Sequence, residues 1–202
     1  INKKYKNIYI KNIRFNSKEC KPNDIFFAIQ GNNSDGNRYI DEAINNGAKV
    51  IVSGSKSHRS NTKKVLFIYN KNPRKMLSYI SSQFYKLKPN NIIAVTGTNG
   101  KTSIANFYHQ IMSLNNKKVA SIGTLGVLSK KFNLETNNTT IDPVNIHKIL
   151  QRLKKLGVDN VMIEASSHGL KQHRIDNINF KTAIFTNLSR DHLDYHKTIK
   201  DY

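Results

Sequence analysis

A glycine-rich segment carries the clearest chemistry in the chain. Residues 96–103 read Thr-Gly-Thr-Asn-Gly-Lys-Thr-Ser and follow an apolar run, which gives the order strand, tight turn, lysine and hydroxyl. Gly97 and Gly100 permit a turn whose successive N–H groups face one phosphate. A helix that opens at Lys101 adds its positive dipole end. The Lys101 ammonium suits the β- and γ-phosphates of a nucleotide, and the Thr102 hydroxyl suits Mg²⁺.

This loop is a short variant of the common phosphate-binding pattern. That pattern has another glycine five residues before Gly100, where this chain has Val95. A plain Asn-Gly turn before a helix is the alternative interpretation, but the strand–loop–helix order favours a phosphate site. The predicted nucleotide-binding residues are Gly97, Thr98, Asn99, Gly100, Lys101, Thr102, Ser103 and, from the tip of a later strand, Asn187.

A second group of candidate residues follows two later apolar runs. Glu164 ends one run, and His192 comes shortly after the next. A carboxylate and an imidazole at neighbouring strand ends beside a phosphate loop can hold a divalent ion. The alternative for Glu164 is a helix cap or a salt bridge to Lys101. For His168 and His173, a hydrogen-bonded wall of the site is favoured over a catalytic role.

Strand and helix signals alternate in the first part of the chain, to about Pro89. Strands are predicted at 24–29, 50–53 and 65–69, the last two as β-branched runs typical of buried strands. A short helix at 39–46 is expected to turn Tyr39, Ala43 and Ile44 inward. A second helix follows an Asn72 cap and Pro73, and its expected buried stripe is Met76, Leu77, Ile80, Phe84 and Leu87.

The alternation continues after a predicted linker at residues 87–91. Such alternation implies a parallel sheet covered by helices, with ligands at the carboxyl ends of the strands. The phosphate loop, Glu164 and Asn187 all fall at strand ends. The predicted elements are strand 92–96, helix 101–114, strand 119–122, a helix from Pro143 that stops at Gly157, and strands 161–165 and 183–186.

Composition narrows the class of protein. The chain has 202 residues, 38% of them hydrophobic, with one cysteine, Cys20, which excludes an internal disulfide framework and fits a reducing cytosol. No apolar segment is long enough to span a membrane. The net charge of +20 has two possible explanations, a polyanionic partner or a general drift of the composition toward lysine. The basic residues form no long block. Ile1 and Tyr202 look like cut ends, the second within a predicted helix.

Several blocks of sequence together resemble the Mur ligases. They are Thr96–Thr102, the run Asn138-Thr139-Thr140, the run 166–170 (Ser-Ser-His-Gly-Leu) with Gln172, His173 and Arg174, and the run 187–196 (Asn-Leu-Ser-Arg-Asp-His-Leu-Asp-Tyr-His). The resemblance is greatest to the members that add the third peptide residue in peptidoglycan synthesis. It implies an α/β fold with two parts: a small N-terminal UDP-sugar-binding domain at 1–89 and an incomplete P-loop-type, parallel-sheet ATP-binding domain at 90–202.

The first domain carries the resemblance less strictly. Asn16-Ser17-Lys18 stands where the family usually has Asp-Ser-Arg, and Ile141 stands where it often has proline after the paired threonines. The resemblance implies that uridine-nucleotide contacts come from Ser17, Asn32, Asn33 and Ser34. It implies that the muramoyl-peptide is held by Asn138, Thr139, Thr140, Ser166, Gln172 and Arg174.

The implied activity is ATP-dependent amide-bond formation. The γ-carboxylate of UDP-MurNAc-L-Ala-D-Glu would be phosphorylated and then attacked by the amine of a diamino acid, meso-diaminopimelate rather than L-lysine. The resemblance implies Lys101, Glu164 and His192 as catalytic residues. It also implies Mg²⁺ on Thr102 and Glu164, with His192 on a second ion. A carbamylated lysine and a C-terminal domain are expected beyond Tyr202, so this piece alone is expected to be inactive.

Other functions remain open from the residues. They are another Mur-type or cyanophycin-type ligase, an inactive nucleotide-binding fragment, and a P-loop nucleic-acid or switch protein. The last would require a basic patch interleaved with aromatic residues, which the sequence lacks. We therefore expect no nucleic-acid partner. No membrane partner is expected either, and a cytoplasmic monomer is the default expectation.

Overall fold

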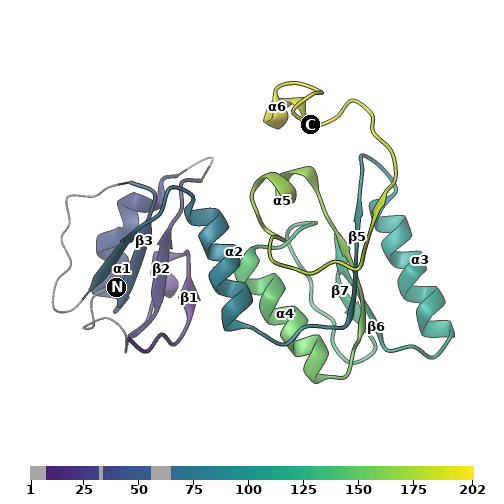
Figure 1. Ribbon diagram of the computed structural model, residues 1–202, viewed down its shortest axis with the longest axis horizontal. Helices are drawn as coiled ribbons and strands as arrows, with labels where there is room; N and C mark the ends of the chain where they lie inside the picture. Colours follow the sequence, from purple (N-terminus) through teal and green to yellow (C-terminus); the bar gives the residue numbers. More distant parts are fainter. Residues whose placement is uncertain (1–7, 32–33, 56–64) are drawn as a thin grey trace. The chain divides into compact units, whose positions relative to one another are not determined.

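The computed structural model describes residues 8–31, 34–55 and 65–202, which form two compact units that divide between Leu77 and Ser78 (Figure 1). Each unit is an α/β structure built on its own sheet. The domain boundary predicted at 89/90 stays a prediction. The predicted Asn32 and Asn33 contacts fall outside the described residues. Within the described ranges, no helix is both long and apolar enough to cross a bilayer.

The first unit has a four-stranded, fully parallel sheet in the order β1-β2-β3-β4. Its strands are β1 (Ile13–Arg14), β2 (Ile25–Ala28), β3 (Val50–Ser53) and β4 (Leu66–Tyr69). The connections hold the 3₁₀ turns η2 (Ser17–Glu19) and η3 (Gly36–Tyr39) and the helix α1 (Ile40–Asn45). The helix α2 (Pro73–Phe84) crosses into the second unit.

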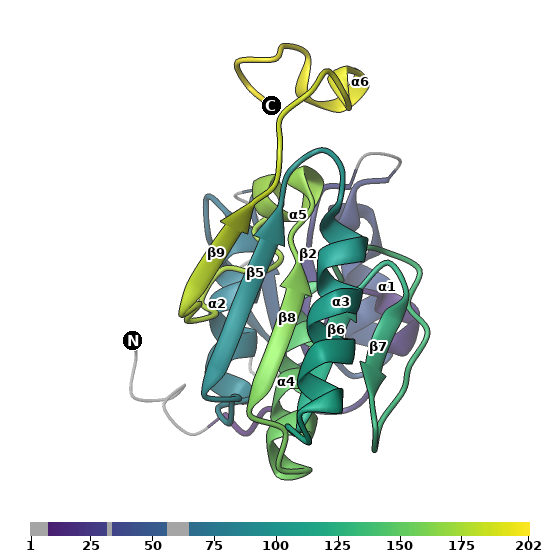
Figure 2. The ribbon, with the colours of Figure 1, turned by 90° about the vertical axis from the view of Figure 1, so that its right-hand side faces the viewer.

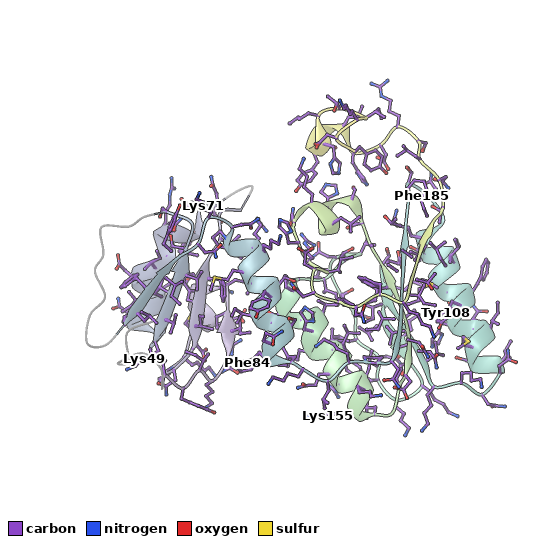
Figure 3. The ribbon with its side chains drawn as sticks, viewed as in Figure 1. Lys49, Lys71, Phe84, Tyr108, Lys155 and Phe185 are labelled. Atoms are coloured by element: carbon purple, nitrogen blue, oxygen red, sulfur yellow. The ribbon has the colours of Figure 1, made fainter. Side chains whose placement is uncertain are left out.

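Three burial predictions for this part of the chain are wrong. Tyr39 is 42% exposed, because a 3₁₀ turn precedes the helix and rotates Ile40 inward in its place. β4 is an edge strand, so its side chains are only half-buried and Tyr69 is exposed. Phe84 and Leu87 are exposed, because α2 ends at Phe84 and the chain leaves as coil (Figure 3).

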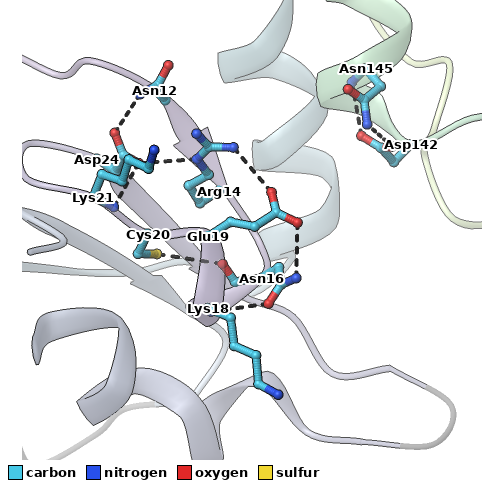
Figure 4. Close-up of polar contacts among 10 residues, drawn as sticks. All are labelled: Asn12, Arg14, Asn16, Lys18, Glu19, Cys20, Lys21, Asp24, Asp142 and Asn145. Atoms are coloured by element: carbon cyan, nitrogen blue, oxygen red, sulfur yellow. Dashed lines mark hydrogen bonds and ion pairs between the residues drawn. The ribbon is translucent and has the colours of Figure 1, made fainter. Parts of the chain in front are cut away.

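A network of side-chain hydrogen bonds holds the first turns of this unit together (Figure 4). The fully buried Asp24 carboxylate accepts from Asn12 Nδ2 (2.9 Å), Arg14 Nε (3.2 Å) and the Lys21 amide (3.1 Å). Arg14 also pairs with Glu19. Burial, with Asp24 nearby, raises the pKa of the Cys20 thiol to about 11, so it stays protonated at neutral pH.

The second unit has a five-stranded sheet in the order β7-β6-β8-β5-β9 (Figure 2). Only β7 runs antiparallel, because a tight hairpin joins it to β6. The strands are β5 (Asn91–Thr96), β6 (Val119–Gly123), β7 (Gly126–Ser129), β8 (Asn160–Glu164) and β9 (Thr182–Phe185). The strand β1 of the first unit and the strand β7 were not expected from the sequence.

Two long helices cover opposite faces of this sheet (Figure 2). On one face, Ala105 of α3 (Lys101–Leu114) packs against Val95 and Met162. On the other, α4 (Pro143–Lys155) contributes Ile146, Leu150 and other side chains to the larger core. As predicted, Asp142 caps α4 by accepting from the Asn145 amide at 3.0 Å (Figure 4).

Two short helices follow the carboxyl ends of strands in this unit. They are α5 (Ser167–Lys171) after β8 and α6 (Leu193–His196) in the segment that follows β9 (Figure 1). The helix predicted to run through Tyr202 is not present. Lys197, with φ of +68°, ends α6, and the following residues form turns.

Candidate nucleotide and metal site

The phosphate loop lies between β5 and α3, at the carboxyl end of the sheet as predicted. Gly97 and Gly100 have φ of +131° and +86°, a region that favours glycine. At Gly97, a Cβ atom would lie 2.1 Å from Thr186 Oγ1 and 2.8 Å from the Asn187 carbonyl oxygen. Gly97 is therefore required both by its backbone conformation and by the close approach of the segment after β9.

The segment after β9 holds the loop in shape. The Thr98 amide donates to the Asn187 carbonyl (2.9 Å), and the Asn99 amide donates to Asn187 Oδ1 (3.0 Å). Thr186 Oγ1 donates to the Asn99 carbonyl at 2.7 Å. These bonds occupy two of the loop amides that the sequence assigned to a phosphate. The amides at the first turn of α3, from Lys101 onward, have no intrahelical acceptor and point out of the helix start.

Lys101 is folded back over its own loop. Its Nζ donates to the carbonyls of Gly97 (2.6 Å) and Thr98 (2.8 Å). Among the described residues, no carboxylate forms an ion pair with this ammonium, so the salt bridge to Glu164 considered from the sequence does not form here. The lysine and the first turn of α3 together provide a positive region at the end of β5.

Glu164 lies at the end of β8 with only 2% of its surface exposed. Its Oε2 accepts from the hydroxyls of Thr102 (2.8 Å) and Thr124 (3.1 Å), and its Oε1 accepts from the Thr124 amide (3.1 Å). The two hydroxyls are 3.3 Å apart. A buried carboxylate and two hydroxyls thus converge on one point beside the phosphate loop.

Gly123, at the end of β6, makes room for that carboxylate. A Cβ there would lie 2.0 Å from Glu164 Oε1 and 2.3 Å from Glu164 Cδ. Sequence reasoning missed Gly123 and Thr124. The available signal was a Gly-Thr pair directly after the predicted strand at 119–122, which places a small residue and a hydroxyl at the same edge of the sheet as Glu164.

The oxygen donors at this point suit Mg²⁺. Magnesium prefers hard oxygen ligands, keeps several waters and takes one or two carboxylates together with phosphate oxygens. Glu164 Oε2 with the Thr102 and Thr124 hydroxyls meets that description. In the described part of the chain, no three His, Cys, Asp or Glu side chains gather as a metal site, and Glu164 is the one carboxylate in this group of oxygens.

His192 lies in a different cluster. Its ring stacks edge-on against His168, with 4.8 Å between ring centroids, and lies near Asp191. Its contacts within the described residues do not include Thr102 or Glu164. Burial, together with His192 and His196, lowers the pKa of His168, which favours a neutral ring. His192 thus lies apart from the contacts of Thr102 and Glu164, and the second ion that the resemblance assigns to it stays a prediction.

The predicted muramoyl-peptide residues form a connected group around α5. Thr140 Oγ1 donates to the Glu164 carbonyl (2.9 Å) and accepts from the Ser166 amide (2.8 Å), while Thr139 Oγ1 lies 3.0 Å from Thr124 Oγ1. The Ser166 hydroxyl caps α5 by accepting from the Gly169 amide. A Cβ at Gly169 would lie 2.6 Å from Thr140, which explains the glycine in that block.

Arg174 and Gln172 are held by this group. The Arg174 guanidinium donates to Gln172 Oε1 (2.8 Å from Nη2) and to the Thr140 carbonyl (2.6 Å from Nη1). Gln172 Nε2 in turn donates to the Tyr195 hydroxyl at 3.1 Å. Asn138 is exposed, and its carbonyl accepts from Thr136. Hydrogen bonds thus connect the side chains of Thr139, Arg174 and Gln172 to the Glu164 site through Thr124 and Thr140.

In the first unit, Ser17 is buried and donates its hydroxyl proton to Glu42. Its carbonyl accepts from Asn46 Nδ2 at 3.0 Å. Ser34 is exposed, and its carbonyl accepts from the Gly31 amide. The uridine contacts assigned to these two serines stay predictions.

These features define a class of protein: an α/β nucleotide-binding protein of the phosphate-loop type, with an acidic residue on the neighbouring strand. The chain belongs to the Mur ligase family. The family model described as the Mur ligase middle domain matches residues 95–202, and the one described as the Mur ligase family, catalytic domain, matches residues 9–85. The resemblance and the α/β fold predicted from the sequence are thereby confirmed.

Two curated relatives carry the same name. The UDP-N-acetylmuramoyl-L-alanyl-D-glutamate--2,6-diaminopimelate ligase of Bradyrhizobium diazoefficiens is 42% identical over 193 residues, 96% of this chain and 39% of that protein. The enzyme of the same name from Rickettsia montanensis is 42% identical over 197 residues, 96% of this chain and 40% of that protein. This chain spans about two-fifths of the length of these curated relatives.

Solved structures agree on the fold. A 2,6-diaminopimelate ligase of this name superposes with a TM-score of 0.80 at 30% identity, over 96% of this chain and 39% of its own. The MurF ligase of Thermotoga maritima, solved in complex with ADP, gives a TM-score of 0.64 at 22% identity, over 97% of this chain and 42% of its own. The second match supports the fold alone.

Proposed function

We propose that this chain forms the UDP-sugar-binding and ATP-binding part of an amide ligase that joins 2,6-diaminopimelate to UDP-MurNAc-L-Ala-D-Glu. The observation that carries the proposal is the convergence of Thr102 and Thr124 on the buried Glu164 carboxylate, beside the Lys101 loop. The family membership and the names of the relatives support the same reaction.

The chemistry needs a carboxylate to be made reactive. An oxygen of the γ-carboxylate of D-Glu attacks the γ-phosphorus of ATP, and ADP leaves, which yields an acyl phosphate. The amine of the diamino acid then attacks the acyl carbon, loses a proton, and inorganic phosphate leaves with the C–O bond electrons. Because little covalent chemistry falls to the protein, positioning and charge neutralisation dominate.

Lys101 and the first turn of α3 are the groups of this chain that would neutralise the phosphates. In the structure the Lys101 ammonium satisfies two loop carbonyls. When a nucleotide binds, we expect the ammonium to turn toward the β- and γ-phosphates, and the first amides of α3 to donate to the same oxygens. The Asn187 side chain holds the loop in shape by bonding both the amide and the carbonyl of Asn99, and its predicted contact with the nucleotide stays part of the proposal.

Thr102, Thr124 and Glu164 would hold Mg²⁺. Bound there, the ion would neutralise the charge of the transferring phosphoryl group. Both threonine hydroxyls now donate to Glu164, and rotation about their Cβ–Oγ bonds would turn lone pairs toward an ion without moving the backbone. We keep His192 as a residue for a second ion, as the family resemblance implies.

The muramoyl-peptide substrate would be held by the hydrogen-bonded residues around α5, next to the Glu164 site. Arg174 suits a carboxylate because its fork binds both oxygens. The remaining contacts proposed for the muramoyl-peptide are Asn138, Thr139, Thr140, Ser166 and Gln172, and those for the uridine nucleotide are Ser17 and Ser34. A cytoplasmic monomer without nucleic-acid partners completes the proposal.

Nucleotide binding tests the first half of the proposal. Isothermal titration of the 202-residue chain with ATP in Mg²⁺ should give saturable one-to-one binding, and Lys101→Ala should weaken it at least tenfold. Lys148→Ala, an exposed lysine on α4, is the matched control and should bind as the wild type does. Equal affinity in Lys101→Ala and the wild type would contradict the site assignment.

The ligase reaction tests the second half. It is measured in a protein that contains this chain together with the family's C-terminal domain. ADP release should require both UDP-MurNAc-L-Ala-D-Glu and the diamino acid, and diaminopimelate should be preferred to L-lysine. ATP binding without such release would favour a nucleotide-binding protein of another function.

A further inference from the structure

We propose a second anion-binding site, for a small phosphate ester with an apolar body, at the end of the sheet opposite the phosphate loop. A pocket of about 290 Å³ lies there in the second unit. It is lined by residues from the end of α3, the start of β6, the end of β7 and the turn after α4. These residues are Ser113, Asn116, Lys117, Lys118, Val119, Ser129, Lys130, Lys131, Leu156 and Val158.

The topology separates this pocket from the proposed ATP site. The pocket lies where β6 begins, and the phosphate loop follows the end of β5, which runs parallel to β6 through β8. Six residues of β5 span roughly 20 Å. One small ligand therefore cannot occupy both sites. Lys155, labelled at the end of α4 in Figure 3, marks the end of the unit where the pocket lies.

Charge determines the class of ligand. Two lysine pairs, Lys117-Lys118 and Lys130-Lys131, come from two different loops and meet at the pocket. Among its described lining residues there is no carboxylate. Asp159 lies close enough to Lys118 to have its carboxyl pKa lowered by it, but Lys154 is the main cause of that shift and its direct partner. Within the described residues, Lys117, Lys130 and Lys131 form no ion pair.

The helix ends at the pocket do not favour a cation there. The last carbonyls of α3 and α4 are ordinarily the negative ends of the helix dipoles. Here the loop amides already bond them: Lys117 to Met112, Asn116 to Ser113, Val158 to Leu153 and Gly157 to Lys154, at 2.9–3.0 Å. The lysines therefore dominate the electrostatics of the pocket.

The apolar residues that line the pocket are the reason to expect a ligand with an apolar part. Val119 and Val158 are 4% and 3% exposed, and Leu156 is half-buried, so hydrocarbon lies behind a rim of ammonium groups. A bare inorganic ion would leave most of the 290 Å³ beside this hydrocarbon to be filled by water. A ligand with a short apolar part and a dianionic head would cover the wall and neutralise two or more lysines.

Phenyl phosphate is the probe we would use, with inorganic phosphate and phenol as its two halves. Titration into the ¹⁵N-labelled 202-residue chain should shift the amide resonances of Ser129, Lys130 and Val158 in a saturable way. Inorganic phosphate should bind at least tenfold more weakly, and phenol should shift none of them. Shifts of equal midpoint for phenyl phosphate and inorganic phosphate would overturn the proposed apolar subsite.

Three variants locate the binding. Lys117→Gln with Lys131→Gln should weaken phenyl phosphate binding about tenfold, whereas Lys86→Gln with Lys148→Gln, which removes two exposed charges elsewhere in the unit, should change it less than twofold. Lys101→Ala should leave it unchanged. Loss of phenyl phosphate binding in Lys101→Ala would assign that binding to the phosphate loop. An equal loss of binding in both double variants would show non-specific attraction to positive charge. Either result would overturn the proposal without touching the proposed ligase function.

Discussion

Two carboxylates, Asp24 in the first unit and Glu164 in the second, are about equally buried but are held by different kinds of donor. Asp24 accepts from a guanidinium, a side-chain NH₂ group and a backbone N–H, all groups that can only donate. Glu164 accepts mainly from two threonine hydroxyls, which can donate or accept. The first arrangement is complete and structural. In the second, the hydroxyl protons can rotate away from Glu164, so that the hydroxyl lone pairs and the carboxylate could face a cation.

The largest effect is expected in the first unit, from Asp24→Ala. The change leaves the Arg14 guanidinium and two other donors without their buried acceptor, which costs about 3 kcal/mol or more. Hydrogen exchange should show lost protection of the β2 and β3 amides, with β5 and β8 unchanged. Glu19→Ala removes the other, exposed partner of Arg14 and should cost under about 0.5 kcal/mol. Comparable losses of stability in both variants would show that Asp24 contributes no more to this unit than the exposed Glu19 does.

Gly123→Ala should have the next largest effect, and it acts on the second carboxylate. The added methyl would overlap Glu164 Oε1, so the carboxylate must leave the Thr124 amide and the two hydroxyls. We expect ATP affinity in Mg²⁺ to fall about a hundredfold, equivalent to about 2.7 kcal/mol. Gly54→Ala, where the nearest atom is a proline side-chain carbon at 3.2 Å, is the control and should bind ATP normally. Titration calorimetry with ATP in Mg²⁺ on both variants is the measurement, and equal ATP affinity in the two would contradict the role given to Gly123.

His147 extends the comparison to a buried base. Burial, with Lys88 nearby, lowers the pKa of His147 to about 4. The unfolded chain takes up a proton near pH 6.5 and the folded chain does not, so stability falls as pH drops from 6.5 toward 4. The loss should be about 2 kcal/mol at pH 5 relative to pH 8. His147→Leu should flatten this difference in chemical unfolding measurements, and an unchanged pH dependence would show that other groups cause it.

Glu164→Gln sharpens the contrast between structure and site. The amide fills the same space, so stability should change by less than about 1 kcal/mol. ATP affinity should fall about tenfold in Mg²⁺ and stay the same in EDTA, because only the ion-binding charge is lost. Glu135→Gln, an exposed carboxylate, is the matched control. A large fall in stability with no change in Mg²⁺ dependence would place Glu164 in the same structural role as Asp24.

The smallest effect is expected from Thr124→Val. Valine keeps the backbone N–H that bonds Oε1 and removes only one of the two hydroxyls. ATP affinity in Mg²⁺ should fall about threefold, or about 0.6 kcal/mol, and Thr124→Ser should restore it. Equal affinity in the valine and serine variants would remove Thr124 from the ion site and leave it as a support for Glu164.

The sequence by itself determined the features that depend on near neighbours in the chain. The glycines of the phosphate loop, the opening of a helix at Lys101 and the Asp142 cap on α4 were all predicted. Each depends on backbone conformation or on hydrogen bonds over a few residues. The strand–helix alternation likewise predicted parallel sheets, and it placed Glu164 and Asn187 at the loop's edge of the sheet.

Only the tertiary structure decided how donors were shared between distant segments. Thr124 and Glu164 are 40 residues apart, and Asn99 and Asn187 are 88 apart. The sequence therefore did not show that Asn187 occupies two loop amides, that Gly123 makes room for Glu164, or that His192 lies with His168. The burial errors at Tyr39 and Phe84 have a different origin, because helical periodicity predicts a buried face but not the residue at which the helix begins or ends. The lysine pocket between four segments also arises from packing, since no local pattern brings residues 117 and 131 together.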